Sequence, residues 1–453
     1  MDRRDFLKNS AALTAATVVA PGMLAADKTA SKNGAQTPDT AEAAPLIASA
    51  PMLQNYASTS MGVAFAVSDM ANGYVLLSER PDMDGARKVK CGGYRVTDMN
   101  DKVQQIRLTG LKPATRYYYR IGADRISYQG GYKMSILGTE EDPRTYSFVT
   151  AGKDAEGHFC VINDTHARFA TFDLLTDKIA ALAPSCVIWN GDTCNNEEQI
   201  EGQIRNFLAP PIARKDYASE IPYLFAPGNH DSRGMANRHI ERVWMWRQPE
   251  ERSSRDWDLG RNFAVRMGDI ALIGLDTAED KQDTNPIFAG LFNSSAYREA
   301  QVAWLADALK RKEIATAPFL VAFCHIPLFD DDPTHNPGDI APADYDPQYS
   351  ADYAYWQRSC AQLWTPLLEK AKCQLIVTAH MHIYRYDPPT ATRKWAQLVG
   401  GGPRLDEGPD RFPTVIEGRV ETTGPGKKGR KLHITVHNML TGTVQDEFRF
   451  SAR

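Results

Sequence analysis

The chain has 453 residues, which favours two or three domains over one. Hydrophobic residues make up 43% of the sequence and charged residues 24%, so the composition is that of a folded protein and excludes wholesale disorder. The formal net charge of −4 gives no reason to expect a nucleic-acid partner.

Residues 1–26 read as an export signal, with a frayed basic terminus as the alternative. Arg3 and Arg4 precede an apolar, alanine-rich run, which Pro21 and Gly22 interrupt. The run is too short to span a bilayer comfortably, so no stable membrane anchor is expected. The RR-x-F-L-K pattern resembles a twin-arginine signal. This resemblance implies the twin-arginine export machinery as a partner and a periplasmic or extracellular location.

The cysteines fit a protein that folds before export, in a reducing compartment. There are seven of them, an odd number without tight spacing, which argues against a disulfide framework. Cys160, Cys186, Cys324 and Cys373 lie in or beside apolar runs, where a free thiol behaves as a small hydrophobic side chain.

Residues 27–44 are predicted to be a flexible linker, and residues 45–150 an all-β domain. Strands are expected at residues 62–67, 103–108 and 145–150. Tyr117, Tyr119 and Ile121 alternate with polar residues, which indicates a half-buried strand. The L-x-P-x-T-x-Y stretch that ends at Tyr117 resembles the tyrosine corner of a fibronectin type III domain. This resemblance implies a β-sandwich in which the tyrosines are core and corner residues.

Residues 153–453 have the pattern of an α/β domain, since apolar strand-like runs alternate with helical stretches. Strands are expected at 159–163, 186–190, 223–226, 264–276, 319–324, 374–378 and 395–399. Helices are expected at 172–182 and 300–310, and a final β pair at 433–437 and 447–450.

Short polar motifs follow five of these strands, where α/β folds assemble their sites. In chain order, the motifs contain Asp164 and His166, then Asp192, then Asn229, His230 and Asp231, then His325, and finally His380 and His382. Imidazole and carboxylate together favour first-row transition metals, because calcium and magnesium prefer shells of oxygen alone. Without His230 and Asp231, seven side chains remain, and each of two ions receives four of them if Asp192 bridges.

Two metals suit the hydrolysis of phosphate esters. They lower the pKa of a bridging water, and they neutralise the charge that develops on the phosphate. Two carboxylates against two divalent ions leave a formal excess of about two positive charges, which suits hydroxide and a phosphate anion. Each motif is weak by itself, and an isolated His325 is more often a satisfied core histidine. The joint order of the motifs carries the prediction.

This order, D-x-H, GD, GNHD, H and (G/A)-H-x-H, resembles that of the calcineurin-like metallophosphoesterases. The resemblance implies an α/β (α+β) sandwich of two sheets flanked by helices, and a metal-dependent phosphoric ester hydrolase. It assigns Asp164, His166, Asp192 and His382 to the first metal, and Asp192, Asn229, His325 and His380 to the second. It implies that His230 binds phosphate and protonates the leaving oxygen, with Asp231 as its orienting partner.

The front domain narrows the resemblance toward bacterial relatives of purple acid phosphatases. Purple enzymes carry a tyrosine three residues after the bridging aspartate and lack the histidine of D-x-H, whereas this chain has Asn195 and His166 there. Without a tyrosinate ligand, the purple charge-transfer band is not expected. The cofactors implied are two divalent or trivalent ions of iron, manganese or zinc. Ala379 replaces the usual glycine, which is a mild departure.

The expected reaction is the hydrolysis of small phosphate monoesters by in-line attack of a metal-bridging hydroxide. A phosphodiesterase or nucleotidase is the alternative, and a non-catalytic exported binding protein is the alternative from another class. Arg168 and Arg233 follow metal motifs and could grip phosphate bidentately, and Asn195 is a further candidate for substrate binding. Aromatic residues of the long loops 277–297 and 329–355 could stack on an organic leaving group.

Overall fold

The computed structural model describes residues 44–92, 101–246, 257–330, 347–406, 408–422, 424, 426 and 429–453, without the side chains of residues 347–358. The predicted signal and all but the last residue of the predicted linker lie outside these ranges. Residues 44–453 form one compact unit. Within the described ranges, no helix is both long enough and apolar enough to cross a membrane.

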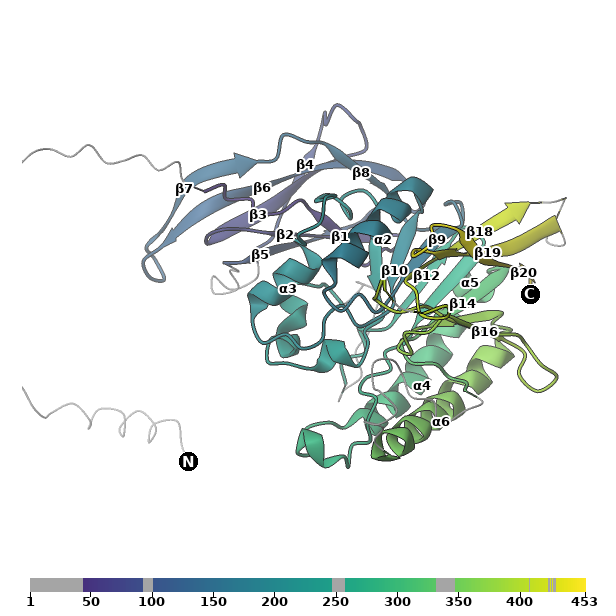
Figure 1. Cartoon of the computed structure of the whole chain (residues 1–453). Helices are drawn as coiled ribbons and strands as arrows, with labels where there is room; N and C mark the ends of the chain where they lie inside the picture. The colour runs from purple at the N-terminus through teal and green to yellow at the C-terminus, as the bar shows by residue number, and fades with distance from the viewer. Residues whose placement is uncertain are drawn as a thin grey trace, which may run out of the picture. The chain divides into compact units, whose positions relative to one another are not determined.

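The largest sheet has nine strands in the order β20-β19-β18-β9-β10-β11-β1-β2-β5 (Figure 1). The three central strands, β9, β10 and β11, are parallel, and β18 pairs antiparallel with β9. The strands are β1 (Met52–Gln54), β2 (Ser60–Ala66), β5 (Val103–Thr109), β9 (His158–Ile162), β10 (Cys186–Trp189), β11 (Tyr223–Phe225), β18 (Thr414–Thr422), β19 (Arg430–Asn438) and β20 (Val444–Ser451).

A six-stranded sheet of order β12-β13-β14-β15-β17-β16 packs against the first one. Its strands are β12 (Phe263–Met267), β13 (Ile270–Gly274), β14 (Phe319–Phe323), β15 (Leu375–Thr378), β16 (Arg385–Asp387) and β17 (Ala396–Val399). The rings of Phe159 in β9 and Phe323 in β14 meet edge to face at 5.8 Å, inside a cluster of buried residues from both sheets. The main core therefore lies between the sheets.

One predicted strand is wrong. Residues 264–276 form two antiparallel strands, β12 and β13, in which Met267 pairs with Ile270. Gly268 adopts a φ of +57° in the tight turn between them. A Cβ at this position would also lie 2.6 Å from the carbonyl oxygen of Ala155, so the turn requires glycine.

Helices cover the outer faces of both sheets (Figure 1). The outer face of the nine-stranded sheet packs against α2 (Phe169–Leu182) and α3 (Ile200–Phe207), with Phe172 stacked on Trp189 at 4.9 Å. The outer face of the six-stranded sheet packs against α4 (Ser294–Lys310), α5 (Lys312–Ala315) and α6 (Pro347–Lys370). Short 3-10 helices are η1 (His230–Ser232), η2 (Asn237–Arg242) and η3 (Pro286–Phe288). This is the expected arrangement of two sheets flanked by helices.

The front region is rich in strands, as predicted, but β1, β2 and β5 belong to the nine-stranded sheet, where Gln54 of β1 pairs with Tyr223 of β11. The remaining strands, β3 (Ala71–Ser78), β4 (Arg87–Lys90), β6 (Arg116–Tyr128), β7 (Met134–Glu141) and β8 (Tyr146–Val149), form a separate sheet. The backbone N–H of Lys112 donates to the Tyr117 hydroxyl at 2.9 Å, which is the bond expected of a tyrosine corner. A fibronectin type III domain that ends at residue 150 stays a prediction.

Candidate metal centre

Five loops from both sheets bring the candidate ligands together. They follow β9, β10, β11, β14 and β15, the strands predicted to end in polar motifs. One group has ligand atoms that all lie within 4.8 Å of one another and consists of Asp164, His166, Asp192 and His382. The same holds for a second group, Asp192, His325 and His380. Asp192 belongs to both groups.

Asn229 extends the second group, since its Oδ1 lies 3.0 Å from Nδ1 of His380. Asn229 is 1% exposed and Asp192 is also 1% exposed, so these oxygens are shielded from bulk water. The structure thus places all seven predicted ligands in two adjoining sets that share one carboxylate.

The donor atoms fit bound cations. The Nε2 atoms of His166 and His382 face each other at 2.9 Å. Oδ1 of Asp164 is buried and makes no hydrogen bond among the described residues, although Nε2 of His382 and Nε2 of His325 lie 3.3 and 3.8 Å from it. Buried polar atoms are normally hydrogen-bonded, so this carboxylate oxygen indicates a missing positive partner. Nitrogen and oxygen donors in this mixture suit first-row transition metals.

The electrostatics of the pocket hold His166, His380 and Asp192 in the protonation state that metals need, and His325 is the exception. Burial lowers the pKa of His166 to about 4 and that of His380 to about 3, which leaves both imidazoles neutral. Burial alone would raise the pKa of Asp192, but the facing His325 and His230 lower it well below its ordinary value. Burial opposes charge on His325, yet Asp192 and Asp164 raise its pKa to about 10. In the absence of a cation, His325 therefore holds a proton between two carboxylates.

The backbone at the site is strained. Asp164, His166, Asp192, His380 and His382 have φ values of 46°, 45°, 51°, 68° and 53°, in the left-handed region. For a residue other than glycine, such a conformation costs about 1–2 kcal/mol. Strain of this kind persists where the surroundings fix the residue, and it clusters at functional sites.

Two motif glycines are required by close contacts. A Cβ at Gly191 would lie 2.2 Å from Nδ1 of His325, and a Cβ at Gly228 would lie 2.2 Å from Oδ1 of Asp192. Only glycine lets the two loops approach the ligands this closely.

Two candidate ligands are oriented by asparagines that the sequence analysis missed. Asn163 donates to Oδ2 of Asp164 at 2.6 Å and to the carbonyl of Gly401 at 2.8 Å. The backbone carbonyl oxygen of Asn190 lies 2.9 Å from Nδ1 of His325, which directs Nε2 of that ring toward Asp192 at 3.2 Å and Asp164 at 3.8 Å. The signal was present in the sequence, since each asparagine directly precedes a motif at the end of its strand.

The role expected for Asp231 is different in the structure. Nδ1 of His230 lies 2.8 Å from the backbone carbonyl oxygen of Asn195, so this carbonyl orients the ring. Asp231 is buried and accepts from the backbone N–H groups of Asp192, Thr193 and Gly228 at 2.8–3.0 Å, and from the Thr193 hydroxyl at 2.6 Å. It therefore links the loop after β11 to the loop after β10. Its carboxylate points away from the neighbouring His230 and toward Asp192 and Thr193.

The three candidates for substrate binding are placed differently. The Asn195 Oδ1 lies 2.8 Å from Nδ1 of His166, so Asn195 contacts two of the site histidines. Arg168 is exposed before α2, and no bond holds its side chain within the described ranges. Arg233 lies beside His230, with Nη1 3.2 Å from Nε2 of the ring. Substrate binding by these residues stays a prediction.

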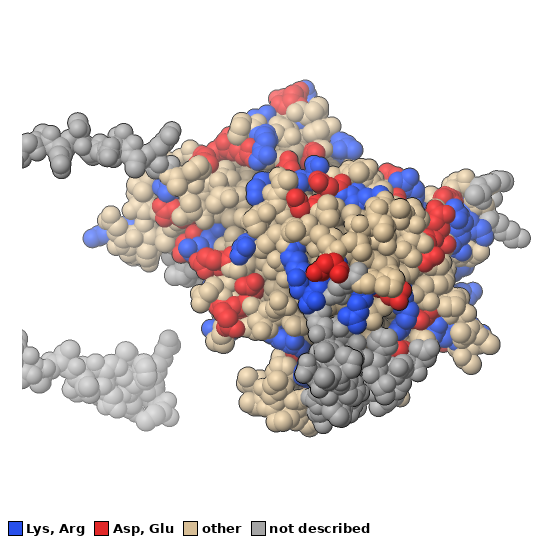
Figure 2. Space-filling model, in the orientation of Figure 1, with Lys and Arg blue, Asp and Glu red and all other residues tan. Residues whose placement is uncertain are grey.

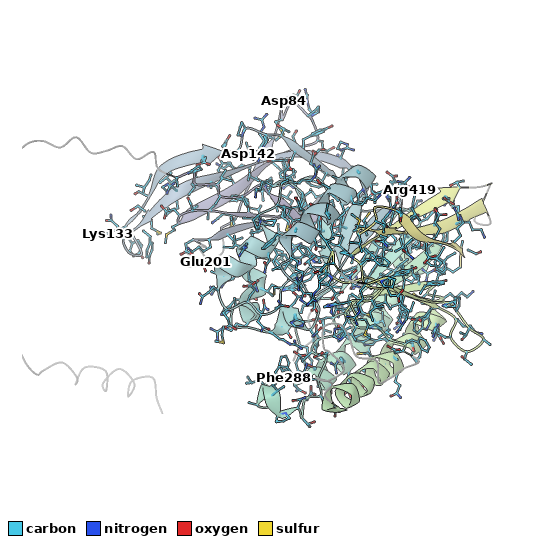
Figure 3. The ribbon with its side chains drawn as sticks, in the orientation of Figure 1. Asp84, Lys133, Asp142, Glu201, Phe288 and Arg419 are labelled. Carbon is cyan, nitrogen blue, oxygen red and sulfur yellow. The ribbon has the colours of Figure 1, made fainter. Side chains whose placement is uncertain are left out.

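The loop aromatics are partly described. Phe288, labelled in Figure 3, lies in the segment that precedes α4. Its ring packs edge to face on that of Phe292, with centroids 4.5 Å apart. Phe292 also lines a cavity of about 300 Å³ together with Gly228, Trp257 and Tyr297. Tyr345 and the side chains of Tyr349 and Tyr353 lie outside the described residues.

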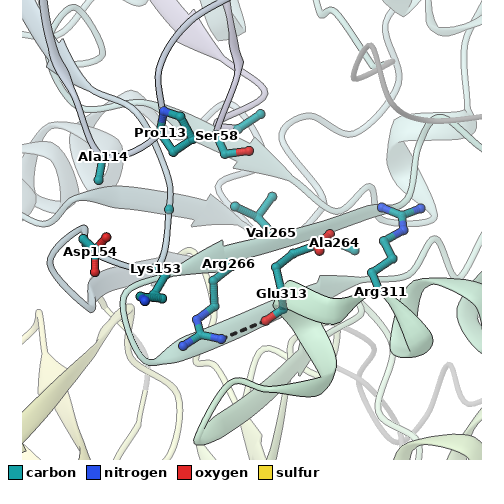
Figure 4. A pocket seen from close by; sticks show the side chains of 12 residues that line it. Ser58, Pro113, Ala114, Lys153, Asp154, Ala264, Val265, Arg266, Arg311 and Glu313 are labelled. Carbon is teal, nitrogen blue, oxygen red and sulfur yellow. Dashed lines mark hydrogen bonds between the residues drawn. The ribbon is translucent and has the colours of Figure 1, made fainter.

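Another cavity, of about 370 Å³, has none of the motif residues in its wall (Figure 4). Lys153, Arg266 and Arg311 contribute positive charges to its wall. Nη1 of Arg266 donates to the carbonyl oxygen of Glu313 at 2.8 Å, so packing already uses this cation. Figure 2 shows acidic and basic side chains interspersed over the visible face, without a large basic patch there.

Residues 157–384, half of the chain, match the model of the calcineurin-like phosphoesterase family. The chain belongs to this family, a class of metal-dependent phosphoric ester hydrolases that use a two-metal centre. The expected enzyme class is thereby confirmed.

Proteins that are similar to this chain include phosphatases. Purple acid phosphatase 23 of Arabidopsis thaliana is 22% identical over 303 residues, which cover 62% of this chain and 57% of the relative's length. The purple acid phosphatase PPD1 of yellow lupin (Lupinus luteus) aligns with a TM-score of 0.61 at 14% identity, over 90% of this chain and 75% of its own. PhoD aligns with a TM-score of 0.55 at 13% identity, over 90% and 94%. At 14% and 13% identity, the similarity to these two structures shows a shared fold and nothing more.

Proposed function

We propose that the protein is a two-metal phosphatase that hydrolyses phosphate monoesters by in-line attack of an activated water. One observation carries this proposal. Two adjoining ligand groups share Asp192, and the backbone N–H of His230 donates to Oδ1 of that same carboxylate at 2.9 Å. A residue able to move a proton thus sits directly beside the two-metal site.

The cations would be iron, manganese or zinc, four ligands each, with Asp192 common to both sets. When bound, they supply Lewis acidity that lowers the pKa of water and offsets phosphate charge. The first set is Asp164, His166, Asp192 and His382, and the second is Asp192, Asn229, His325 and His380. Asn195 stands where purple enzymes have tyrosine, so no purple band is expected.

The geometry supports a part for His230 as general acid. A carbonyl oxygen only accepts, so the bond to Asn195 keeps a proton on Nδ1 whether or not the ring is charged. Nε2 is therefore the atom that gains and loses a proton. Nη1 of Arg233 lies 3.2 Å from Nε2, so a cation lies beside the atom that would protonate the leaving oxygen. Arg168 and Asn195 are weaker candidates for the same phosphate.

The monoester preference follows the likeness to purple acid phosphatases, and export through the twin-arginine machinery follows residues 1–26. The physiological compartment would then be periplasmic or extracellular. The substrate would be a small molecule.

His230→Ala in the metal-loaded full chain tests the proposal. Rates on p-nitrophenyl phosphate should fall at least a hundredfold, because removing a general acid costs about 10²–10⁴-fold, with the metal content unchanged. His239→Ala is the control, since this histidine is 41% exposed and pairs with Glu241. Equal rates for His230→Ala and wild type would contradict the assigned role. Faster wild-type turnover of bis(p-nitrophenyl) phosphate would favour a phosphodiesterase, and no turnover of either ester would favour a binding protein.

A further inference from the structure

Four charged side chains outside the seven ligands form a cluster beside His230: Arg233, Glu279, Asp280 and Lys281. Nε of Arg233 donates to Oε2 of Glu279 at 2.9 Å, and Nη2 donates to Oε1 of Glu279 at 2.5 Å. Nη2 also donates to Oδ1 of Asp280 at 2.8 Å, and Nζ of Lys281 lies 2.8 Å from this same oxygen. Two cations thus balance two carboxylates.

The carboxylates of the cluster are withdrawn from water. Glu279 is 0% exposed and Asp280 is 2% exposed. A buried carboxylate is costly unless it is paired and hydrogen-bonded, so these two groups fix the guanidinium that they hold. Burial opposes charge on Arg233, but the hydrogen bond to Glu279 and the charge of Asp280 outweigh it and raise the pKa of Arg233. The guanidinium therefore remains charged.

The arrangement leaves one end of Arg233 directed at the site. Nε and Nη2 are bonded to carboxylates, whereas Nη1 has no carboxylate partner among the described residues. Nη1 lies 3.2 Å from Nε2 of His230 and 3.4 Å from Nδ1. In addition, Oδ2 of Asp280 lies 3.9 Å from Nε2 of His380, a candidate ligand of the second group. The cluster thus contacts both the proposed acid and the proposed metal site.

We propose that Glu279 and Asp280 are positioning residues that hold Arg233 so that its Nη1 and Nε2 of His230 grip the same phosphate group. A planar guanidinium fixed along one edge presents its remaining N–H donors in one direction, which suits a phosphate oxygen. This inference rests on the proposed function. It adds two carboxylates to the machinery, both in the irregular segment after β13.

A merely structural role would give different results. If the cluster only stabilised the packing of the segment after β13 on η1, breaking it would lower the midpoint temperature of unfolding. The phosphate affinity of the folded protein would not change. A positioning role predicts that breaking the cluster changes the phosphate affinity more than it changes the midpoint temperature of unfolding. The two roles are separable by measuring folding and phosphate binding on the same samples.

The test is Glu279→Gln, which replaces the carboxyl group that holds Arg233 with an amide of the same shape. The dissociation constant of inorganic phosphate for the metal-loaded protein should rise about tenfold by calorimetry, since a hydrogen bond to a charged group is worth about that factor. The metal content should stay at the wild-type value, and KM for p-nitrophenyl phosphate should rise more than kcat falls. In an Arg233→Met background, Glu279→Gln should have no further effect, because it acts through Arg233.

Asp387→Asn is the matched control. Asp387 accepts from Nε of Arg385 at 3.1 Å, so this variant also breaks a partly buried arginine–carboxylate pair, and phosphate affinity should not change. A dissociation constant within twofold of wild type in folded Glu279→Gln would overturn the proposal. If Glu279→Gln fails to fold, the phosphate affinity of Arg233→Met is measured instead. An affinity of Arg233→Met equal to that of wild type would also overturn the proposal. Weakened phosphate binding without ester turnover in wild type would contradict the proposed function and leave the positioning role standing.

Discussion

The Nε2 atoms of His166 and His382 lie 2.9 Å apart, although the two residues are 216 positions apart in the chain. Their rings meet at 77°, with centroids 4.8 Å apart. Two imidazole nitrogens at this distance can share at most one proton, and otherwise their lone pairs repel. A cation that accepts both lone pairs would stabilise the contact.

His382→Ala should therefore remove the first metal and leave the second. The remaining set of Asp192, Asn229, His325 and His380 does not include His382, so about one metal equivalent per chain should remain by elemental analysis. His239→Ala serves as the control for a histidine outside the site. Retention of two equivalents by His382→Ala would contradict the ligand assignment.

Metal binding should release a proton from His325. Its pKa in the metal-free protein is raised to about 10, although burial opposes the charge, because Asp192 and Asp164 face it. At pH 7 the ring is therefore protonated, and a cation must displace that proton. Metal affinity should rise with pH between 7 and 9. Calorimetric titration in two buffers of different ionisation enthalpy should show about one proton released per chain, and buffer-independent heats would contradict this.

Asp231→Asn should disrupt both metal loops. The carboxylate accepts from three backbone N–H groups and one hydroxyl, whereas an amide would turn its NH₂ group toward some of these donors. The loss of unfolding free energy should be about 3 kcal/mol or more, together with weaker metal binding. Asp177→Asn is the control, since Asp177 is 56% exposed and pairs with Arg214 at 3.4 Å. Comparable denaturant midpoints for both variants would count against this role.

Glu417 should stabilise the fold in a pH-dependent way. Hydrogen bonds from His158 at 2.9 Å and His437 at 3.1 Å lower the pKa of Glu417 below its ordinary value of 4.5. A depressed carboxyl pKa adds stability that is present above the unfolded-state pKa and is lost as the pH falls through the folded-state value. Glu417→Gln should cost about 1–3 kcal/mol at pH 7 in the metal-free protein.

Urea unfolding at several pH values checks this prediction. The stability difference between wild type and Glu417→Gln should shrink as the pH drops below about 4.5, where the unfolded chain takes up the proton. A difference that stays constant from pH 7 to pH 3 would show that packing, and not the carboxylate charge, accounts for the cost.

The side chains that cluster in the candidate metal centre could be predicted from the sequence because the family motifs are local and each follows a buried strand. Asp164 after β9 and Asp192 after β10 are examples, and their strands were predicted to within about two residues at each end. The prediction of a single strand over the apolar run 264–276 was wrong because a hairpin and a long strand share the same hydrophobic pattern. Only Gly268 marks the turn. β18 was missed, since its half with Glu417, Arg419 and Glu421 is polar.

The supporting contacts could not be predicted for a different reason. Glu279 and Asp280 lie in an irregular segment with no motif, and they reach Arg233 across more than forty positions of sequence. The expected partner of Asp231, His230, was wrong, because the direction of a side chain in a tight 3-10 turn depends on loop packing. Periodicity and motif order carry no information about such contacts.

The most direct test of the two-metal site is the metal content of the full chain purified without added metal. Elemental analysis of iron, manganese and zinc should give about two equivalents per chain in wild type, and fewer than one in Asp192→Ala, because both ligand groups share this carboxylate. A single equivalent in wild type, or two equivalents in Asp192→Ala, would contradict the shared site.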